Sequence, residues 1–175
     1  CGHGTTDGVM RIIGIDPGLQ RTGWGIIDVQ GSKLTHISHG VIKTDPKAPM
    51  AERLMKIFDE LTQQMGIWQP QDAAIEETFV HKNPASSLSL GQARGVALMA
   101  PAKLGLAVSE YPATLVKKSV VGTGHAEKEQ VQAMIKILLL GVEASSDAAD
   151  ALAVAICHAN HSASRARMGG IMSGG

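Results

Sequence analysis

The segment Ser145–Ile156, which reads SSDAADALAVAI, constrains the fold of this 175-residue chain more than any other. Alanine, leucine, valine and isoleucine surround its two aspartates, so the segment predicts a helix packed closely against other structure. A carboxylate that leaves water without a partner is costly or becomes protonated. Asp147 and Asp150 also repel each other, because positions three apart are neighbours on a helix. The fold must therefore supply something that offsets these two charges.

Local explanations also exist for the acids in this chain. Asp147 follows Ser146 at the expected start of the helix, where the helix dipole favours negative charge. Asp16 precedes Pro17-Gly18 and is equally typical of a turn. Glu76 is harder to explain locally, because it follows the continuous apolar run Ala73–Ile75, which predicts a buried strand.

The composition is that of an ordinary globular protein, with 44% apolar residues and a net charge of zero. No apolar run approaches the roughly 20 residues needed to span a bilayer. Cys1 and Cys157 have no metal-ligand spacing, so we expect a cytoplasmic protein without disulfides or a membrane span. Between His81 and Lys128, six Lys or Arg residues face two Glu residues, which fits a surface for a polyanion and also fits chance.

The order of strands and helices predicts an α/β protein with a mixed sheet. Short turns join the first three expected strands, which indicates an antiparallel meander, and later strands alternate with helices. The expected strands are residues 10–16, 24–30, 33–43, 72–77 and 107–111. The expected helices are residues 48–65, 84–104, 112–121, 126–140 and 146–164. Residues 1–9 are expected to be a tag or disordered leader, residues 10–163 a single domain, and residues 164–175 a flexible tail.

This arrangement can bring the acids together. Asp16 ends the first strand and Glu76 lies near the end of the fourth, so parallel pairing of these strands would place them about 5 Å apart. The last helix, docked through its alanine face, would add Asp147 and Asp150. Four converging carboxylates favour a hard divalent cation such as Mg²⁺. Two such ions roughly 4 Å apart can catalyse an in-line phosphoryl displacement.

Several motifs, in this order, resemble the RuvC family of Holliday junction resolvases: IIGIDPGLQRTGWG, AAIEETFV, NPASSLSLGQARG, AEKEQV and SDAADALAVAI. The resemblance spans about residues 10–163. It implies a ribonuclease H-like fold with a mixed five-stranded sheet, three antiparallel strands followed by parallel additions, flanked by helices. It also implies a Mg²⁺-dependent endodeoxyribonuclease that cuts four-way DNA junctions in recombination and repair. The implied enzyme is a homodimer, uses two ions per site for which Mn²⁺ can substitute, and works with a branch-migration motor.

The resemblance assigns roles to individual residues. The metal-binding and catalytic tetrad falls on Asp16, Glu76, Asp147 and Asp150, with Lys117 and Lys128 as catalytic cations beside the scissile phosphate. Glu77 is left out, because it points to the opposite face of its strand from Glu76. The residues implied in DNA binding are Arg21, Phe79, Lys82, Asn83, Arg94 and Lys118. Asn83 also has a local explanation as a helix start, and Phe79 as a core residue. Arg94 can serve either DNA binding or the dimer interface.

Some features depart from the family or favour other functions. Ser89 stands where the family commonly has a basic residue, and the neutral net charge is unusual for a DNA-binding protein. A non-catalytic junction-binding module, a general ribonuclease H-like nuclease and an actin-like ATP-binding protein are the alternatives. The last needs a duplicated second domain, for which 175 residues are too few. Five histidines are expected at the surface or at helix caps: His36, His39, His125, His158 and His161.

Overall fold

The computed structural model of the chain describes residues 8–77 and 83–172. Within these residues, the strands form a five-stranded sheet in the order β3-β2-β1-β4-β5. The strands are β1 (Met10–Asp16), β2 (Arg21–Gln30), β3 (Lys33–Lys43), β4 (Asp72–Glu77) and β5 (Ala107–Pro112). The β1–β2 and β2–β3 pairs are antiparallel, and β4 pairs in parallel with both β1 and β5. The predicted mixed sheet, with a meander and parallel additions, is confirmed.

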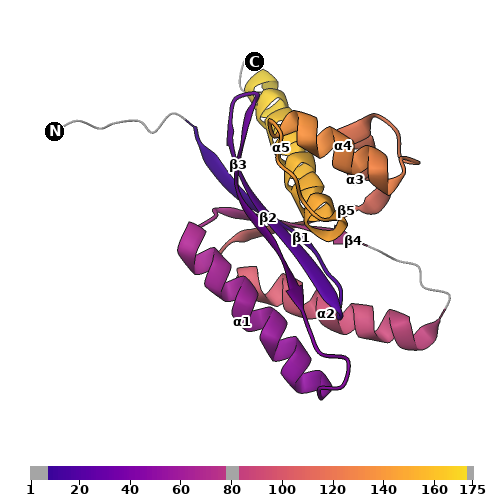
Figure 1. The fold of residues 1–175 in the computed structure, drawn as a ribbon. Helices are drawn as coiled ribbons and strands as arrows, with labels where there is room; N and C mark the ends of the chain where they lie inside the picture. The colour runs from indigo at the N-terminus through magenta and orange to yellow at the C-terminus, as the bar shows by residue number, and fades with distance from the viewer. Residues whose placement is uncertain (1–7, 78–82, 173–175) are drawn as a thin grey trace.

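Helices cover both faces of this sheet (Figure 1). They are α1 (Met50–Trp68), α2 (Pro84–Lys103), α3 (Ala113–Val121), α4 (Lys128–Leu138) and α5 (Ser146–Met172). The helices α1 and α2 pack on one face around Ile13, Ile15 and Ile75, whereas α3, α4 and α5 pack on the other face around Ile12 and Ala74. This three-layer arrangement buries both faces, and the continuous apolar runs of β1 and β4 reflect it.

Several boundaries differ from those expected. The strand β2 begins at Arg21 rather than at residue 24, because Thr22 and Gly23 pair with Ile42 and Val41 on β3. The helix α5 runs to Met172, beyond residue 163, where the sequence predicted the domain to end. Gly169 and Gly170, which suggested a tail, lie inside this helix. A glycine weakens a helix by only about 1 kcal/mol, so its presence does not by itself mark an end.

The helix α5 lies unusually close to the sheet because the residues beneath it are glycines. A Cβ atom added to Gly14 on β1 would lie 2.0 Å from the carbonyl oxygen of Ala151, and one added to Gly23 on β2 would lie 2.1 Å from that of Asp147. No side chain fits such a space. Alanines supply much of the buried face of the helix in turn, among them Ala148, Ala151 and Ala155. Small residues on both elements therefore let the helix backbone approach the strands.

A buried polar network fixes α5 against the parallel half of the sheet. The His158 side chain on α5 has Nδ1 at 2.6 Å from the hydroxyl of Tyr111 and Nε2 at 2.7 Å from a carboxylate oxygen of Asp72. His158 is only 3% exposed, so its predicted place at the surface or at a cap is wrong. The spacing of the apolar residues along the helix does not indicate that His158 faces the core. Partners on two distant strands satisfy the polar atoms that burial removes from water.

Two further expectations concern the cysteines and the membrane. Cys157 is buried and free. None of the helices in the described ranges is both long enough and apolar enough to span a bilayer.

Candidate active site

The ends of β1 and β4 place two acids side by side on the face covered by α5. The parallel register pairs Ile15 with Ile75, so Asp16 and Glu76 are the next residues along their strands. Side chains alternate between faces in a strand. Since Ile15 and Ile75 pack toward α1 and α2, Asp16 and Glu76 point to the opposite face. The predicted pairing of the two strands is confirmed, and the same alternation sends Glu77 to the other face.

The first turns of α5 carry the remaining two acids toward the same place. The carbonyl of Asp147 lies over Gly23, and the carbonyl of Ala151, next to Asp150, lies over Gly14. The close approach of the helix thus determines where its acids stand. Asp16 interacts electrostatically with Glu76, Asp147 and Asp150. The structure therefore brings the predicted tetrad together from three elements.

A cavity of about 290 Å³ opens over these acids. Asp16, Glu76 and Asp150 line it together with two cations, Lys117 from α3 and Lys128 from the first residue of α4. Asp147 lies at the edge of a neighbouring cavity instead. Both lysines lie close enough to Glu76 to lower its pKa, although burial raises that pKa more. The cavity thus combines carboxylates with the two positive charges of Lys117 and Lys128.

The cluster holds protons more tightly than exposed carboxyls do. Burial, followed by repulsion from Glu76 and Asp150, raises the pKa of Asp16 to about 9. Burial and the charge of Glu76 raise the pKa of Asp150 to about 6. The side chains of Asp16 and Glu76 also form a hydrogen bond with each other. Two carboxyl groups can bond in this way only if one of them carries a proton.

The donor set fits a hard divalent cation. Its members are carboxylates, which are the ligands that Mg²⁺ prefers, and their mutual repulsion is the kind that a cation relieves. As the described side chains stand, no group of three or more His, Cys, Asp or Glu residues could hold a metal ion. A cation bound by these acids would take the place of the proton that Asp16 and Glu76 share.

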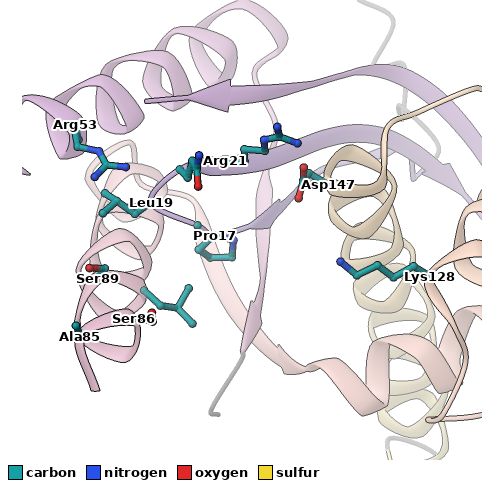
Figure 2. Close-up of a pocket in the computed structure, with 12 residues that line it drawn as sticks. Pro17, Leu19, Arg21, Arg53, Ala85, Ser86, Ser89, Lys128 and Asp147 are labelled. Carbon is teal, nitrogen blue, oxygen red and sulfur yellow. The ribbon is translucent and has the colours of Figure 1, made fainter. Parts of the chain in front are cut away.

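A second cavity, of about 690 Å³, adjoins the acids and is shown in Figure 2. Arg53, Leu19 and Ser89 lie on one side of it, with Asp147 and Lys128 on the opposite side. Lys128 lines both cavities. The predicted DNA-binding residue Arg21 lines the second cavity from the start of β2.

The other residues predicted to bind DNA lie elsewhere or have local partners. Arg94 on α2 pairs with Glu110 on β5. Asn83 is the N-cap of α2, where its side chain accepts a hydrogen bond from the backbone N–H of Ala85 at 2.9 Å. Lys118 is exposed on α3 and lines neither cavity. Phe79 and Lys82 fall outside the described residues.

Sequence reasoning missed Arg53 and Thr44. Thr44 lies in the connection between β3 and α1 and bonds to Leu19 in the turn that follows Asp16. Arg53 lies on α1 and bonds to Thr44. A single arginine in an amphipathic helix belongs to no recognisable motif, so nothing in the sequence pointed to Arg53. The hydroxyl of Thr44 is separated by more than twenty positions from its partner Leu19. Only the folded arrangement makes this pair visible.

The order of the strands and the positions of the acids identify the class of protein. A sheet in this order, with acids at the ends of β1 and β4 and a further pair opening a helix across them, is the arrangement of the ribonuclease H-like nucleases. Residues 12–158 match the family model described as "Crossover junction endodeoxyribonuclease RuvC". The chain belongs to the RuvC family.

Comparisons with known proteins agree over nearly the whole chain. The RuvC crossover junction endodeoxyribonuclease of Paramagnetospirillum magneticum is 60% identical over 153 residues, which is 87% of this chain and 92% of the relative. That of Maricaulis maris is 57% identical over 152 residues, again 87% of this chain and 92% of the relative. The structure of T. thermophilus RuvC in complex with a Holliday junction substrate is 35% identical, with a TM-score of 0.82, covering 91% of this chain and 96% of that one.

Proposed function

We propose that this chain is a structure-selective endonuclease that resolves four-way DNA junctions by metal-dependent hydrolysis of phosphodiester bonds, in homologous recombination and DNA repair. The observation that carries the proposal is the gathering of the half-buried acids Asp16, Glu76 and Asp150 in one cavity, with Asp147 beside them. Membership of the RuvC family supports the junction as substrate, since T. thermophilus RuvC is similar over most of its length and was solved with a Holliday junction.

The tetrad would hold two Mg²⁺ ions, with Mn²⁺ as a substitute. When bound, such ions activate a water molecule and stabilise the leaving oxygen of the displacement. Asp16 and Glu76 would hold these ions from the sheet once their shared proton is lost, and Asp147 and Asp150 would hold them from α5. Lys117 and Lys128, on the other wall, would stabilise the additional negative charge of the transition state at the phosphate. A modest base readout would accompany recognition of junction shape.

Paired cuts on opposed strands require two active sites at a fixed separation, which favours a two-fold homodimer. An apolar hollow between α1 and α2 supports a dimer contact here. It is lined by Ala51, Leu54, Met55, Phe58, Val96 and Met99. Met55 and Met99 are 56% and 55% exposed, and an exposed apolar patch of this kind is a candidate protein–protein contact.

The deciding experiment is a nicking assay on an immobile four-way junction with Mg²⁺, with Ca²⁺ and with a chelator. We expect paired nicks in Mg²⁺ alone, and none from Glu76→Gln protein. The matched control is Glu77→Gln, which removes the neighbouring acid that points to the other face and should cut normally. Junction binding without cutting in any metal would favour a non-catalytic binding module. Equal cutting of linear duplex or RNA–DNA hybrid would favour a general nuclease.

Two finer proposals follow from the family rather than from the site. We propose a partnership with a branch-migration motor, and a cytoplasmic location for this reaction. DNA contacts by Phe79, Lys82 and Lys118 also stay predictions.

A further inference from the structure

The larger cavity beside the acids has the chemistry of a polyanion-binding site. Arg21, Arg53 and Lys128 bring three positive charges to its wall, and Ser86 and Ser89 add two hydroxyl groups from α2. Among its lining residues Asp147 is the acid, and it lies on the side of Lys128, which also lines the smaller cavity. If one phosphate of a DNA strand lies at the acids, the next phosphates of that strand would lie in this cavity.

Arg53 is tied to the turn that directly follows Asp16. Its Nε donates to the hydroxyl oxygen of Thr44 at 2.9 Å, and that hydroxyl donates to the carbonyl oxygen of Leu19 at 2.6 Å. The backbone N–H of Thr44 donates to the carbonyl of Gln20 at 3.2 Å. Thr44 is buried, so this relay is shielded from water. This bond restrains the guanidinium at the cavity wall.

The restrained guanidinium is still able to bind a phosphate. The bond to Thr44 uses one of its five N–H donors, and the planar fork of the remaining donors matches two phosphate oxygens. A lysine on a flexible stem would lose more side-chain freedom per bond formed. An arginine already fixed by a buried hydroxyl therefore contributes a preorganised contact.

We propose that Arg53 binds a backbone phosphate of the cleaved DNA strand, close to the scissile phosphate, and that Thr44 couples this contact to the turn behind Asp16. This inference rests on the proposed function and adds to it a positioning residue on α1. Arg53 fixes the strand in the larger cavity, and the Thr44–Leu19 bond keeps the turn, and with it Asp16, in register with that strand.

The test compares wild-type protein with Arg53→Ala, Arg53→Lys, Thr44→Val and Lys56→Ala. Lys56 is an exposed cation on the same helix that does not line the cavity, so its loss changes the charge of α1 without touching the site. Affinity for an immobile four-way junction is measured in Ca²⁺ over a series of salt concentrations. The cleavage rate is measured in Mg²⁺ at saturating junction, and thermal unfolding is followed for each variant.

We expect Arg53→Ala to weaken junction binding about 10-fold, as the loss of one charged phosphate contact does. Its plot of log affinity against log salt should be shallower by about 0.9, the value for one phosphate contact. Arg53→Lys should restore most of that slope. Thr44→Val should keep the wild-type slope while cutting more slowly at saturation, and Lys56→Ala should match wild type in both measurements.

Partial unfolding cannot imitate this result, because it lowers the concentration of active protein and leaves the salt slope unchanged. A wild-type slope in Arg53→Ala protein would overturn the proposal and leave Arg53 as a structural contact only. An equal loss of slope in Lys56→Ala would overturn it as well, since the effect would then be a general one of charge. Wild-type protein that neither binds nor cuts junctions would instead overturn the proposed function.

Discussion

The surroundings of Asp16 differ strongly from those of an exposed aspartate. Burial, followed by the charges of the three other carboxyls, raises its pKa to about 9. If Asp16 were only a turn residue at the surface, which is the alternative that the sequence allows, it would have no such neighbours. The cluster is therefore strained electrostatically as long as no cation is bound, and two measurements can reveal this strain.

The first concerns the Asp16→Asn substitution. Removing the charge should slow junction cleavage by roughly 100-fold or more, because the loss of one group that stabilises the reacting charge commonly lowers the rate by this much. It should also stabilise the metal-free protein, within the roughly 0.5–3 kcal/mol usual for single substitutions. Chemical denaturation in the presence of a chelator measures the second effect. A destabilised Asp16→Asn protein would contradict the repulsion inferred for the cluster.

The second concerns pH. The folded protein keeps a proton on Asp16 up to about pH 9, whereas the unfolded chain releases it near the ordinary value of 3.8. The stability from this proton is complete below about pH 4 and is lost as the pH rises through 9. We expect metal-free protein to melt at a lower temperature at pH 9 than at pH 6. The difference should shrink in Asp16→Asn protein and on addition of Mg²⁺, as differential scanning calorimetry can show.

At the scale of elements, the packing of α5 on β1 and β2 sets the geometry of the site. Gly14 and Gly23 admit the helix backbone, and the buried bonds of His158 to Tyr111 and Asp72 hold its far side. Because Asp147 and Asp150 belong to the same helix, any shift of α5 away from the sheet moves half of the tetrad. The close packing of the α5 backbone on β1 and β2 therefore determines where two of the four acids lie.

Gly14→Ala tests this link. The added methyl group would meet the carbonyl of Ala151, which cannot move without the helix. We expect a loss of stability of about 1–3 kcal/mol, as for other overpacked sites, together with slower cleavage. Gly66→Ala on α1, where an added methyl group meets nothing within 4 Å, is the control. It should raise stability by up to about 1 kcal/mol, and equal destabilisation of both variants would contradict the explanation.

For the whole molecule, the two faces have different uses. The face of α3, α4 and α5 holds the acids, whereas that of α1 and α2 presents the apolar hollow around Met55 and Met99. Separate faces allow two copies to meet through one surface while both active sites stay open to DNA. The neutral net charge is compatible with DNA binding in this arrangement, since cations gather locally at the cavities.

Met99→Glu should convert the proposed dimer to monomers, because two charges would then be buried against an apolar partner. Sedimentation velocity at micromolar concentrations measures the change. Ile137→Glu, at an exposed apolar position on α4, is the matched control and should leave the mass unchanged. We expect Met99→Glu protein to nick junctions singly and to lose paired cuts. A dimer that persists would place the contact elsewhere.

Local patterns in the sequence are enough to predict most of the elements. Apolar, β-rich runs and the turns beside them predicted the strands over 10–16, 33–43 and 72–77 with the bounds that the structure has, because such signals are local. The family motifs named the acids that the fold then gathers. The resemblance named Glu76, and the alternation of side chains along a strand separated it from Glu77.

The partners that these elements find depend on how the chain folds. The bond of Arg53 to Thr44, the pairing of Arg94 with Glu110 and the burial of His158 all join positions on different elements. No spacing rule relates such positions, because their contact depends on how helices dock on the sheet. The raised pKa of Asp16 has the same origin, since it arises from charges and burial supplied by distant segments.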